Sequence, residues 1–197
     1  QRQRGCARLR IDHPDILHEH AAAKPCTDCL GERLLGGEAL GVSARDGEGA
    51  AARLEIALIQ FAFDTLTKKE FIAVIPPVLI KEEMMRGMGY VDSEADKQER
   101  YHLEKDKLYL VGTAEQSIGP MHAGEIFLEK ELPRRYVAFS TSFRREAGSY
   151  GKDTHGILRV HQFDKIEMFS FVKPEDSKKE HEHLLAMQEE LMRELKI

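Results

Sequence analysis

The sequence predicts an α+β fold in which an antiparallel sheet is flanked by helices. Two segments of helical length and composition, residues 51–67 and 174–195, enclose several apolar segments of strand length. Hairpins or long excursions join these strands, without the regular β–α alternation that is typical of a parallel sheet. A chain of 197 residues is long enough to bury one sizeable core.

The composition is that of an ordinary globular protein, and it argues against some classes of function without indicating a particular one. A net charge of −5 argues against general electrostatic binding of nucleic acid, which depends on many Lys and Arg side chains that neutralise phosphates. Local basic pairs such as Lys68-Lys69 and Arg144-Arg145 leave recognition of RNA by shape open, although such pairs are more often solvated surface. No apolar run approaches the roughly 20 residues that span a bilayer, so no membrane partner is expected.

Residues 1–50 differ from residues 51–197 in composition and in hydrophobic pattern, and we expect the domain boundary between them. The first segment is rich in glycine and shows no sustained period of 2 or 3.6 residues. It is therefore predicted to be weakly ordered or divergent, with a short helix near residues 11–23. Because the chain begins with Gln1 and stops at Ile197 directly after a helical pattern, we expect it to be a piece of a longer protein.

The three cysteines all lie in this first segment. Cys26 and Cys29 have the spacing of zinc ligands, but no second closely spaced ligand pair follows. A bystander pair of thiols is the favoured interpretation, and the alternative is a zinc site completed from Cys6, His13, His18 and His20. Three cysteines do not form a disulfide framework, which predicts a reducing, cytoplasmic location.

The segment 51–67 is predicted to be a helix that is apolar on nearly every side. One side carries Leu54, Leu58, Phe61 and Thr65, and most of the rest carries Ile56, Ile59, Phe63 and Leu66. Such a helix is either a central core helix or lies between its own domain and a partner subunit, and the pattern alone favours the core. A short strand at 71–75 follows and is stopped by Pro76-Pro77, which cannot donate ladder hydrogen bonds.

The remaining elements follow from the same reasoning. In chain order, we expect a helix at 78–88, a hairpin at 101–111 that turns at Lys105-Asp106, a helix entered through residues 112–115, a strand at 136–143, a mobile loop at 148–156, a strand at 157–172, and a final helix with Pro174 in its first turn and a stripe of Leu184, Met187, Leu191 and Leu195.

The run from Phe143 to Glu167 carries the chemistry. In its second strand the side chains repeat every two residues, so one face carries Arg159, His161, Phe163, Lys165 and Glu167. Cations, an aromatic ring and a carboxylate make a poor core face but a good floor for an anionic, ring-bearing ligand that also carries an amine. The alternative for this face is a salt-bridged sheet surface.

Residues 51–197 resemble the catalytic domain of bacterial seryl-tRNA synthetases, which are class II aminoacyl-tRNA synthetases. The helix followed by FIAVIPPVLI resembles motif 1 of that class, Thr113-Ala114-Glu115 resembles the serine-binding TAE element, and FRREAGSYGKDTHGILRVHQFDKIE resembles motif 2. Because motif 1 forms the homodimer interface in the family, the resemblance implies a homodimer through residues 51–77. It also implies a class II sheet flanked by helices.

The resemblance further implies ATP-dependent activation of L-serine and transfer to tRNA-Ser, with tRNA-Sec as a second acceptor and Mg²⁺ beside ATP. Arg144 would stabilise the α-phosphate, Arg159 would reach the β- and γ-phosphates, and Phe163 would stack on adenine. The other implied nucleotide contacts are the backbone of Val160, Arg145 and Glu146, of which the last either contacts the adenine amino group or orients Arg144. The implied serine-binding residues are Thr113, Ala114, Glu115 and Glu167, and which glutamate takes the ammonium is open.

The chain also departs from the family. The family's N-terminal helical hairpin is not recognisable in residues 1–50, and its metal-binding glutamate and motif 3 arginine would follow Ile197. We therefore expect the chain as given to activate serine far more slowly than a complete enzyme. A catalytically silent module that binds nucleotide or dimerises is the alternative function.

Overall fold

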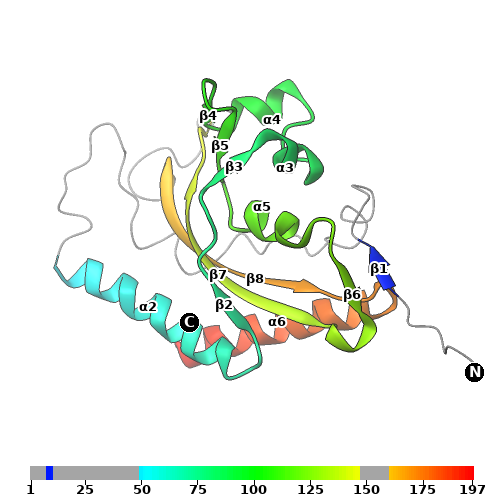
Figure 1. Cartoon of the computed structure of the whole chain (residues 1–197). Coiled ribbons are helices and arrows are strands. Elements are labelled where there is room, and N and C mark those ends of the chain that lie inside the picture. The colour runs from blue at the N-terminus through cyan, green and yellow to red at the C-terminus, as the bar shows by residue number, and fades with distance from the viewer. Residues whose placement is uncertain (1–7, 11–48, 147–159) are drawn as a thin grey trace, which may run out of the picture.

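A computed structural model describes residues 8–10, 49–146 and 160–197 (Figure 1). In chain order its elements are β1 (Arg8–Arg10), α2 (Ala50–Thr67), β2 (Ile72–Val74), β3 (Leu79–Lys81), α3 (Glu82–Gly87), α4 (Glu94–Gln98), β4 (His102–Leu103), β5 (Leu108–Leu110), α5 (Glu115–Ile118), η1 (Gly119–His122), β6 (Ile126–Leu128), η2 (Glu129–Glu131), β7 (Arg134–Phe143), β8 (Gln162–Phe171), η4 (Pro174–Asp176) and α6 (Ser177–Glu194).

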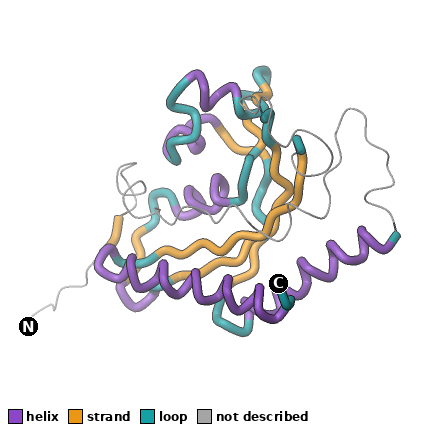
Figure 2. Tube along the Cα trace, turned by 180° about the vertical axis from the view of Figure 1, so that it is seen from behind, coloured by secondary structure: helices purple, strands orange, loops and turns teal. Residues whose placement is uncertain are grey.

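The central element is a long antiparallel hairpin of β7 and β8, which pair over the ten residues of each strand. β2 adds to the other edge of β7 as a short parallel strand. Helices α2 and α6 cover one face of this three-stranded sheet, and α5 lies on the opposite face (Figures 1 and 2). The candidate active site described below lies on the α5 side.

Each face of the sheet has its own hydrophobic core. On one face, Leu66 of α2 and Leu191 of α6 pack against Val137. On the other, Ile118 of α5 packs with Ala138 and with aromatic side chains that include Tyr136, Phe127 and Phe171. Burial on both faces explains why Tyr136, Val137 and Ala138 of β7 form a continuous apolar run rather than alternating with polar residues.

A second, smaller sheet in the order β3-β5-β4 lies beyond the end of the hairpin that carries Phe143. Val111 links it to the central sheet, because this residue donates to the carbonyl of Val78 (2.9 Å) and accepts from the backbone N–H of Phe143 (2.8 Å). Its own core contains Ile80, Met85 and Tyr109. The chain that follows β5 is thereby held at the end of the long hairpin.

An ion pair between a strand and a helix fixes α6 on the sheet. The guanidinium of Arg135 donates twice to Glu180, at 2.6 and 2.8 Å, and the hydroxyl of Ser170 donates to the same carboxylate at 2.8 Å. Burial favours the neutral acid, but the hydrogen bonds from Arg135 and Ser170 outweigh it and hold the pKa of Glu180 below its usual value. The pair therefore stays ionised at neutral pH.

The predicted α+β class is confirmed, as are the helices expected at 51–67 and 174–195, the hairpin before Val111 and the two long strands, although the second strand begins only at Gln162. One element was wrong: the expected helix at 78–88 begins only at Glu82, because Leu79–Lys81 is a strand paired with β5. Two consecutive prolines before this segment favour extended backbone. The parallel pairing of β2 is a second departure, and the long chain between β2 and β7 permits it.

Within residues 1–48 the structure describes only Arg8–Arg10, which form strand β1 against β6. The helix expected near residues 11–23, the possible zinc ligands and the loop at 148–156 lie outside the described residues. No helix in the described part of the chain is long and apolar enough to cross a membrane.

Candidate active site

The floor of the site is the face of the β7–β8 hairpin that is turned toward α5. Phe163, Lys165 and Glu167 alternate along β8 and are all buried. Their register partners on β7 are Ser142, Ser140 and Ala138, which are buried on the same face. We refer to these six residues as the site floor. The predicted alternation from Phe163 to Glu167 is therefore present, and it carries an ionic and aromatic surface at the point where α5 begins.

A polar network joins the floor to the turn before α5. The ammonium of Lys165 lies 2.8 Å from Oε1 of Glu167, and Oε2 of Glu167 accepts from the backbone N–H of Glu115 (3.1 Å) and from the hydroxyl of Thr113. Lys165 also donates to Oγ1 of Thr113 at 3.3 Å. Both oxygens of Glu167 thus already have protein partners.

Glu115 is the second carboxylate of the network and has a different environment. Burial and then the negative charge of Glu167 raise the pKa of Glu115, while the hydroxyl of Tyr90 and the charge of Lys165 act in the opposite direction. Burial and the neighbouring Glu115 in turn raise the pKa of Tyr90, which remains a neutral donor. Two close carboxylates with one lysine between them leave an excess of negative charge at this end of the site.

Arg144 provides positive charge at the other end. Its guanidinium carbon lies 4.9 Å from the ring centroid of Phe163, and its Nε donates to the carbonyl of Gly112 at 3.4 Å. The backbone of Arg144 is held by His161, whose carbonyl accepts from the Arg144 N–H (3.0 Å) and whose Nδ1 lies 3.0 Å from the Arg144 carbonyl. Tyr101 reaches the same Nδ1 at 2.9 Å.

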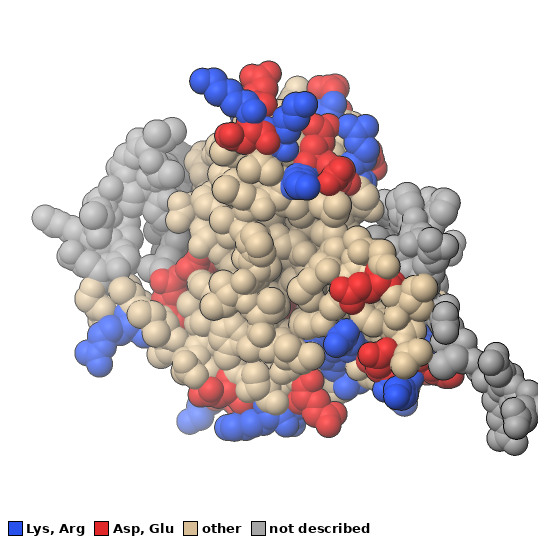
Figure 3. Space-filling view, in the orientation of Figure 1, with Lys and Arg blue, Asp and Glu red and all other residues tan. Residues whose placement is uncertain are grey.

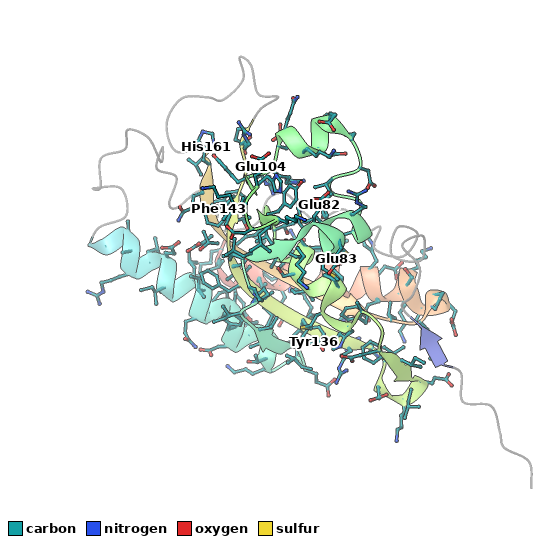
Figure 4. All side chains as sticks on the ribbon, turned by 45° about the horizontal axis from the view of Figure 1, so that its top comes forward. Glu82, Glu83, Glu104, Tyr136, Phe143 and His161 are labelled. Carbon is teal, nitrogen blue, oxygen red and sulfur yellow. The ribbon has the colours of Figure 1, made fainter. Side chains whose placement is uncertain are left out.

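These groups gather at one end of the sheet. Figure 4 shows Phe143 and His161 together beside the hairpin that carries Glu104, and Tyr136 toward the other end of the strands. The turn that enters α5 is fixed by Gln116, a fully buried residue whose Oε1 accepts from the N–H of Gly112 at 2.8 Å. The order along the floor is therefore guanidinium and aromatic ring first, then lysine, then the two carboxylates.

The structure brings together five of the ten predicted site residues. Thr113, Glu115, Glu167, Phe163 and Arg144 meet around the floor. The side chain of Ala114 packs in the core beside Ile118, so only its backbone faces the turn. Three others lie where β7 ends and β8 begins: Val160 is buried, Arg145 is exposed, and Glu146 has a positive φ of 55°. Arg159 lies outside the described residues.

Sequence reasoning missed several residues of the site. Tyr90, Arg100 and Gln116 were not assigned, and the hydroxyls of Ser140 and Ser142 were not placed on the floor. The serines had a detectable signal, since two small polar residues at positions i and i+2 of a strand lie on the same face. Tyr90 and Arg100 had none, because the contacts that bring them to the site are made by residues far apart in the chain.

The described residues do not contain a group of three or more His, Cys, Asp or Glu side chains that could hold a metal ion. Lys165 already neutralises Glu167, which makes this carboxylate of the floor a poor metal ligand. The surface is also not generally basic on the face shown in Figure 3, where positive and negative side chains alternate along the upper and lower edges and the middle is largely uncharged.

A family model described as tRNA synthetase class II core domain (G, H, P, S and T) matches residues 98–197. A serine–tRNA ligase of Clavibacter michiganensis subsp. michiganensis is 51% identical over 148 residues, which are 75% of this chain and 34% of that protein. The chain spans about a third of the length of the curated relatives that it matches.

Two solved structures of seryl-tRNA synthetases are also similar to this chain. The seryl-tRNA synthetase of Pyrococcus horikoshii complexed with ATP is 44% identical, with a TM-score of 0.67 over 73% of this chain and 32% of that chain. The cytoplasmic serine–tRNA ligase of Naegleria fowleri in complex with AMP is 36% identical, with a TM-score of 0.65 over 72% of this chain and 33% of that chain. These matches confirm the resemblance that was predicted from the sequence motifs.

Proposed function

Because the chain belongs to the tRNA synthetase class II core domain family, we propose that it is the part of a serine–tRNA ligase that binds ATP and L-serine and joins them as seryl-adenylate. The observation that carries this proposal is the order of groups along the floor. A cation over an aromatic ring stands at one end and two carboxylates at the other, as a ligand with an anionic, ring-bearing end and an ammonium end requires.

The reaction is an in-line displacement at phosphorus. A carboxylate oxygen of serine attacks the α-phosphorus of ATP, the bond from that phosphorus to the bridging oxygen breaks, and pyrophosphate leaves. Negative charge spreads over the oxygens around the α-phosphorus in the transition state, so a positioned guanidinium contributes stabilisation there. We assign this role to Arg144, whose planar fork matches two phosphate oxygens.

The nucleotide end of the proposed site is built on Phe163. Its ring is held in the floor, and adenine would stack on it once the guanidinium of Arg144 turns toward the phosphates. The backbone of Val160 and the side chains of Arg145 and Glu146 lie near the strand ends and are proposed as further nucleotide contacts. Arg159 is proposed for the β- and γ-phosphates on the basis of its position in the motif alone.

At the amino-acid end we propose that Glu115 receives the ammonium of serine. Both oxygens of Glu167 already accept hydrogen bonds from the protein, whereas Glu115 has a single donor, Tyr90, among the partners identified in the described residues. An arriving ammonium would offset the repulsion between the two carboxylates. Thr113 and Glu167 would then orient the site and offer hydrogen bonds to the serine hydroxyl, which a site must bind to reject alanine and glycine.

The partners follow from the same family assignment and remain proposals. They are tRNA-Ser as the acceptor, tRNA-Sec as a second acceptor, a second copy of the chain as a homodimer, and the cytoplasm as location. Mg²⁺ would accompany the phosphates of ATP. Since the described residues do not offer a metal site, no step here is assigned to that ion.

Replacing Phe163 with Leu tests the nucleotide assignment. Leucine keeps the apolar volume of the floor but removes the π-face, and base–aromatic stacking contributes about 1–3 kcal/mol. We expect Kd for 5′-O-(L-serylsulfamoyl)adenosine, a mimic of seryl-adenylate, to rise roughly fivefold to a hundredfold in calorimetric titration.

Phe169→Leu is the matched control, because it makes the same change on the same strand near the opposite end of β8. It is expected to leave Kd within about twofold of the wild-type value. Equal affinities of the wild-type chain and the Phe163→Leu variant would refute the stacking role. Failure of the wild-type chain to bind the mimic would refute the proposed function as a whole.

A further inference from the structure

Two arginine side chains converge on Gly112, although only one of them belongs to the motif 2 resemblance. A Cβ atom placed on Gly112 would lie 3.0 Å from Nη1 of Arg100 and 3.6 Å from Cγ of Arg144. Arg144 comes from the end of β7, whereas Arg100 follows α4 and comes before β4. Glycine at this position allows both side chains to approach the same turn of the backbone.

Arg100 has no anionic partner at hydrogen-bonding distance among the described residues. Its guanidinium carbon lies 5.2 Å from the ring centroid of Tyr90, and its buried Nε has no hydrogen-bond partner among the described residues. Burial and the like charge of Arg144 lower the pKa of Arg100, while Tyr90 acts in the opposite direction. Two guanidinium groups beside one glycine repel each other, and an anion between them would remove that repulsion.

The same tyrosine links Arg100 to the negative end of the site. The hydroxyl of Tyr90 hydrogen-bonds Glu115, and the guanidinium of Arg100 lies over the ring of Tyr90. The side chain of Tyr90 thus lies between the cation of Arg100 and the carboxylate of Glu115, which is proposed to receive the ammonium of serine. A free α-amino acid has the matching arrangement, with its ammonium and its carboxylate on a single carbon.

We propose that Arg100 is a second substrate-binding arginine, which together with Arg144 receives the carboxylate of the amino acid and, after activation, the anionic linkage of the adenylate. This inference rests on the proposed function and adds a residue from outside motif 2 to its site. Arg100 makes no contact with adenine in this assignment. Its contribution therefore depends on the negative charge of the ligand and on no other part of it.

Two ligands that differ in the charge of the linkage test the proposal. The linker of 5′-O-(L-serylsulfamoyl)adenosine is anionic, whereas that of 5′-deoxy-5′-(L-serylamino)adenosine is neutral. We expect Arg100→Met to raise Kd for the anionic ligand about tenfold to a hundredfold, the range for loss of a hydrogen bond to a charged group. Kd for the neutral ligand is expected to change by no more than about twofold.

Arg86→Met is the matched control, because Arg86 is an exposed arginine of α3 whose ion pair with Glu82 lies away from the site. It is expected to leave both affinities unchanged. Should thermal unfolding show that Arg100→Met does not fold, Arg100→Lys replaces it, with a smaller selective loss of about threefold to tenfold because the charge remains and the planar fork is lost.

An equal loss for both ligands would show that Arg100 only supports Tyr90 and would overturn the proposal. Unchanged affinity of Arg100→Met for the anionic ligand would overturn it as well, while leaving the proposed function intact. If the wild-type chain binds neither ligand, the proposed function fails and this inference fails with it.

Discussion

At the scale of single residues, the ion pair in the floor determines how the site can work. Lys165 and Glu167 are 4% and 9% exposed and lie 2.8 Å apart. Buried charges of this kind are stable only when each is paired and hydrogen-bonded, and Thr113 together with the N–H of Glu115 completes the set. The charges of Lys165 and Glu167 therefore neutralise each other, which leaves Glu115 and the arginines to balance the charges of the ligand.

Replacing Lys165 with Met should destabilise the fold strongly. The substitution keeps most of the side-chain volume but leaves the carboxylate of Glu167 buried without its cation, and breaking such a pair typically costs about 3–5 kcal/mol. Chemical denaturation followed by circular dichroism measures the free energy of unfolding. In the double variant Lys165→Met/Glu167→Gln the buried charge is gone, so we expect much of the loss to be recovered. A single variant as stable as the wild type would contradict the structural role of the pair.

The alternation of Phe163, Lys165 and Glu167 could be predicted because a strand repeats every two residues, whatever it packs against. The position of Arg100 could not. Its approach to Gly112 depends on the small sheet, which joins the main sheet through the hydrogen bond from the N–H of Phe143 to the carbonyl of Val111. The sequence pattern of residues 88–100 does not indicate a contact with the turn at Gly112, which comes later in the chain. The side chains that one strand, β8, contributes to the site could thus be predicted, whereas contacts between residues of different elements could not.

At the scale of elements, helix α2 meets β8 through two carboxyl groups. Glu55 hydrogen-bonds Asp164, which also accepts from the hydroxyl of Thr141 at 2.7 Å. Burial first, and then the hydrogen bond and charge of Asp164, raise the pKa of Glu55 from 4.5 to about 7. A carboxyl group whose pKa is raised on folding holds its proton more tightly in the folded state, so its contribution to stability is lost as pH rises toward 7.

Replacing Glu55 with Gln should therefore flatten the pH dependence of stability. The wild-type chain is expected to lose thermal stability between about pH 5 and pH 7.5 relative to Glu55→Gln, and the variant should unfold at the higher temperature at pH 7.5. Scanning fluorimetry across this range gives the difference in Tm. Asp64→Asn removes a charge from the same helix at an exposed site and is expected to leave the slope unchanged. If Tm changed with pH in the same way for the wild type and Glu55→Gln, the proton would not be held between Glu55 and Asp164.

The elements themselves were predictable to the extent that each has a long periodic segment. Helix α2 and the strands β7 and β8 are long enough for length and composition to identify them. The three residues of β3 are too few to show a period, and their pairing with β5 is set by the later hairpin. The strand β1 was missed for the same reason, since its three residues pair with β6 more than one hundred residues later.

At the scale of the whole molecule, the chain carries the two-sided sheet of the class II core, and large apolar side chains remain exposed on part of it. Leu54 and Ile56 lie on α2, Ile72 lies on β2, and Ile75 follows that strand. β2 is also an edge strand among the described residues. Exposed apolar side chains and an uncovered strand edge are typical of a surface that binds another chain.

Substitutions at these exposed positions test the proposed homodimer through residues 51–77. Phe61 packs against the core of α2 and α6, so a charge there would unfold the monomer as well. Ile56 and Ile75 are 66% and 75% exposed, and Ile56→Asp and Ile75→Asp should leave the monomer folded while placing an unpaired charge in the interface. We expect sedimentation velocity at micromolar concentration to show a wild-type dimer and monomeric variants with unchanged circular dichroism. Leu185→Asp changes an apolar residue of α6 that is 48% exposed and should remain dimeric. A wild-type monomer under these conditions would exclude the interface.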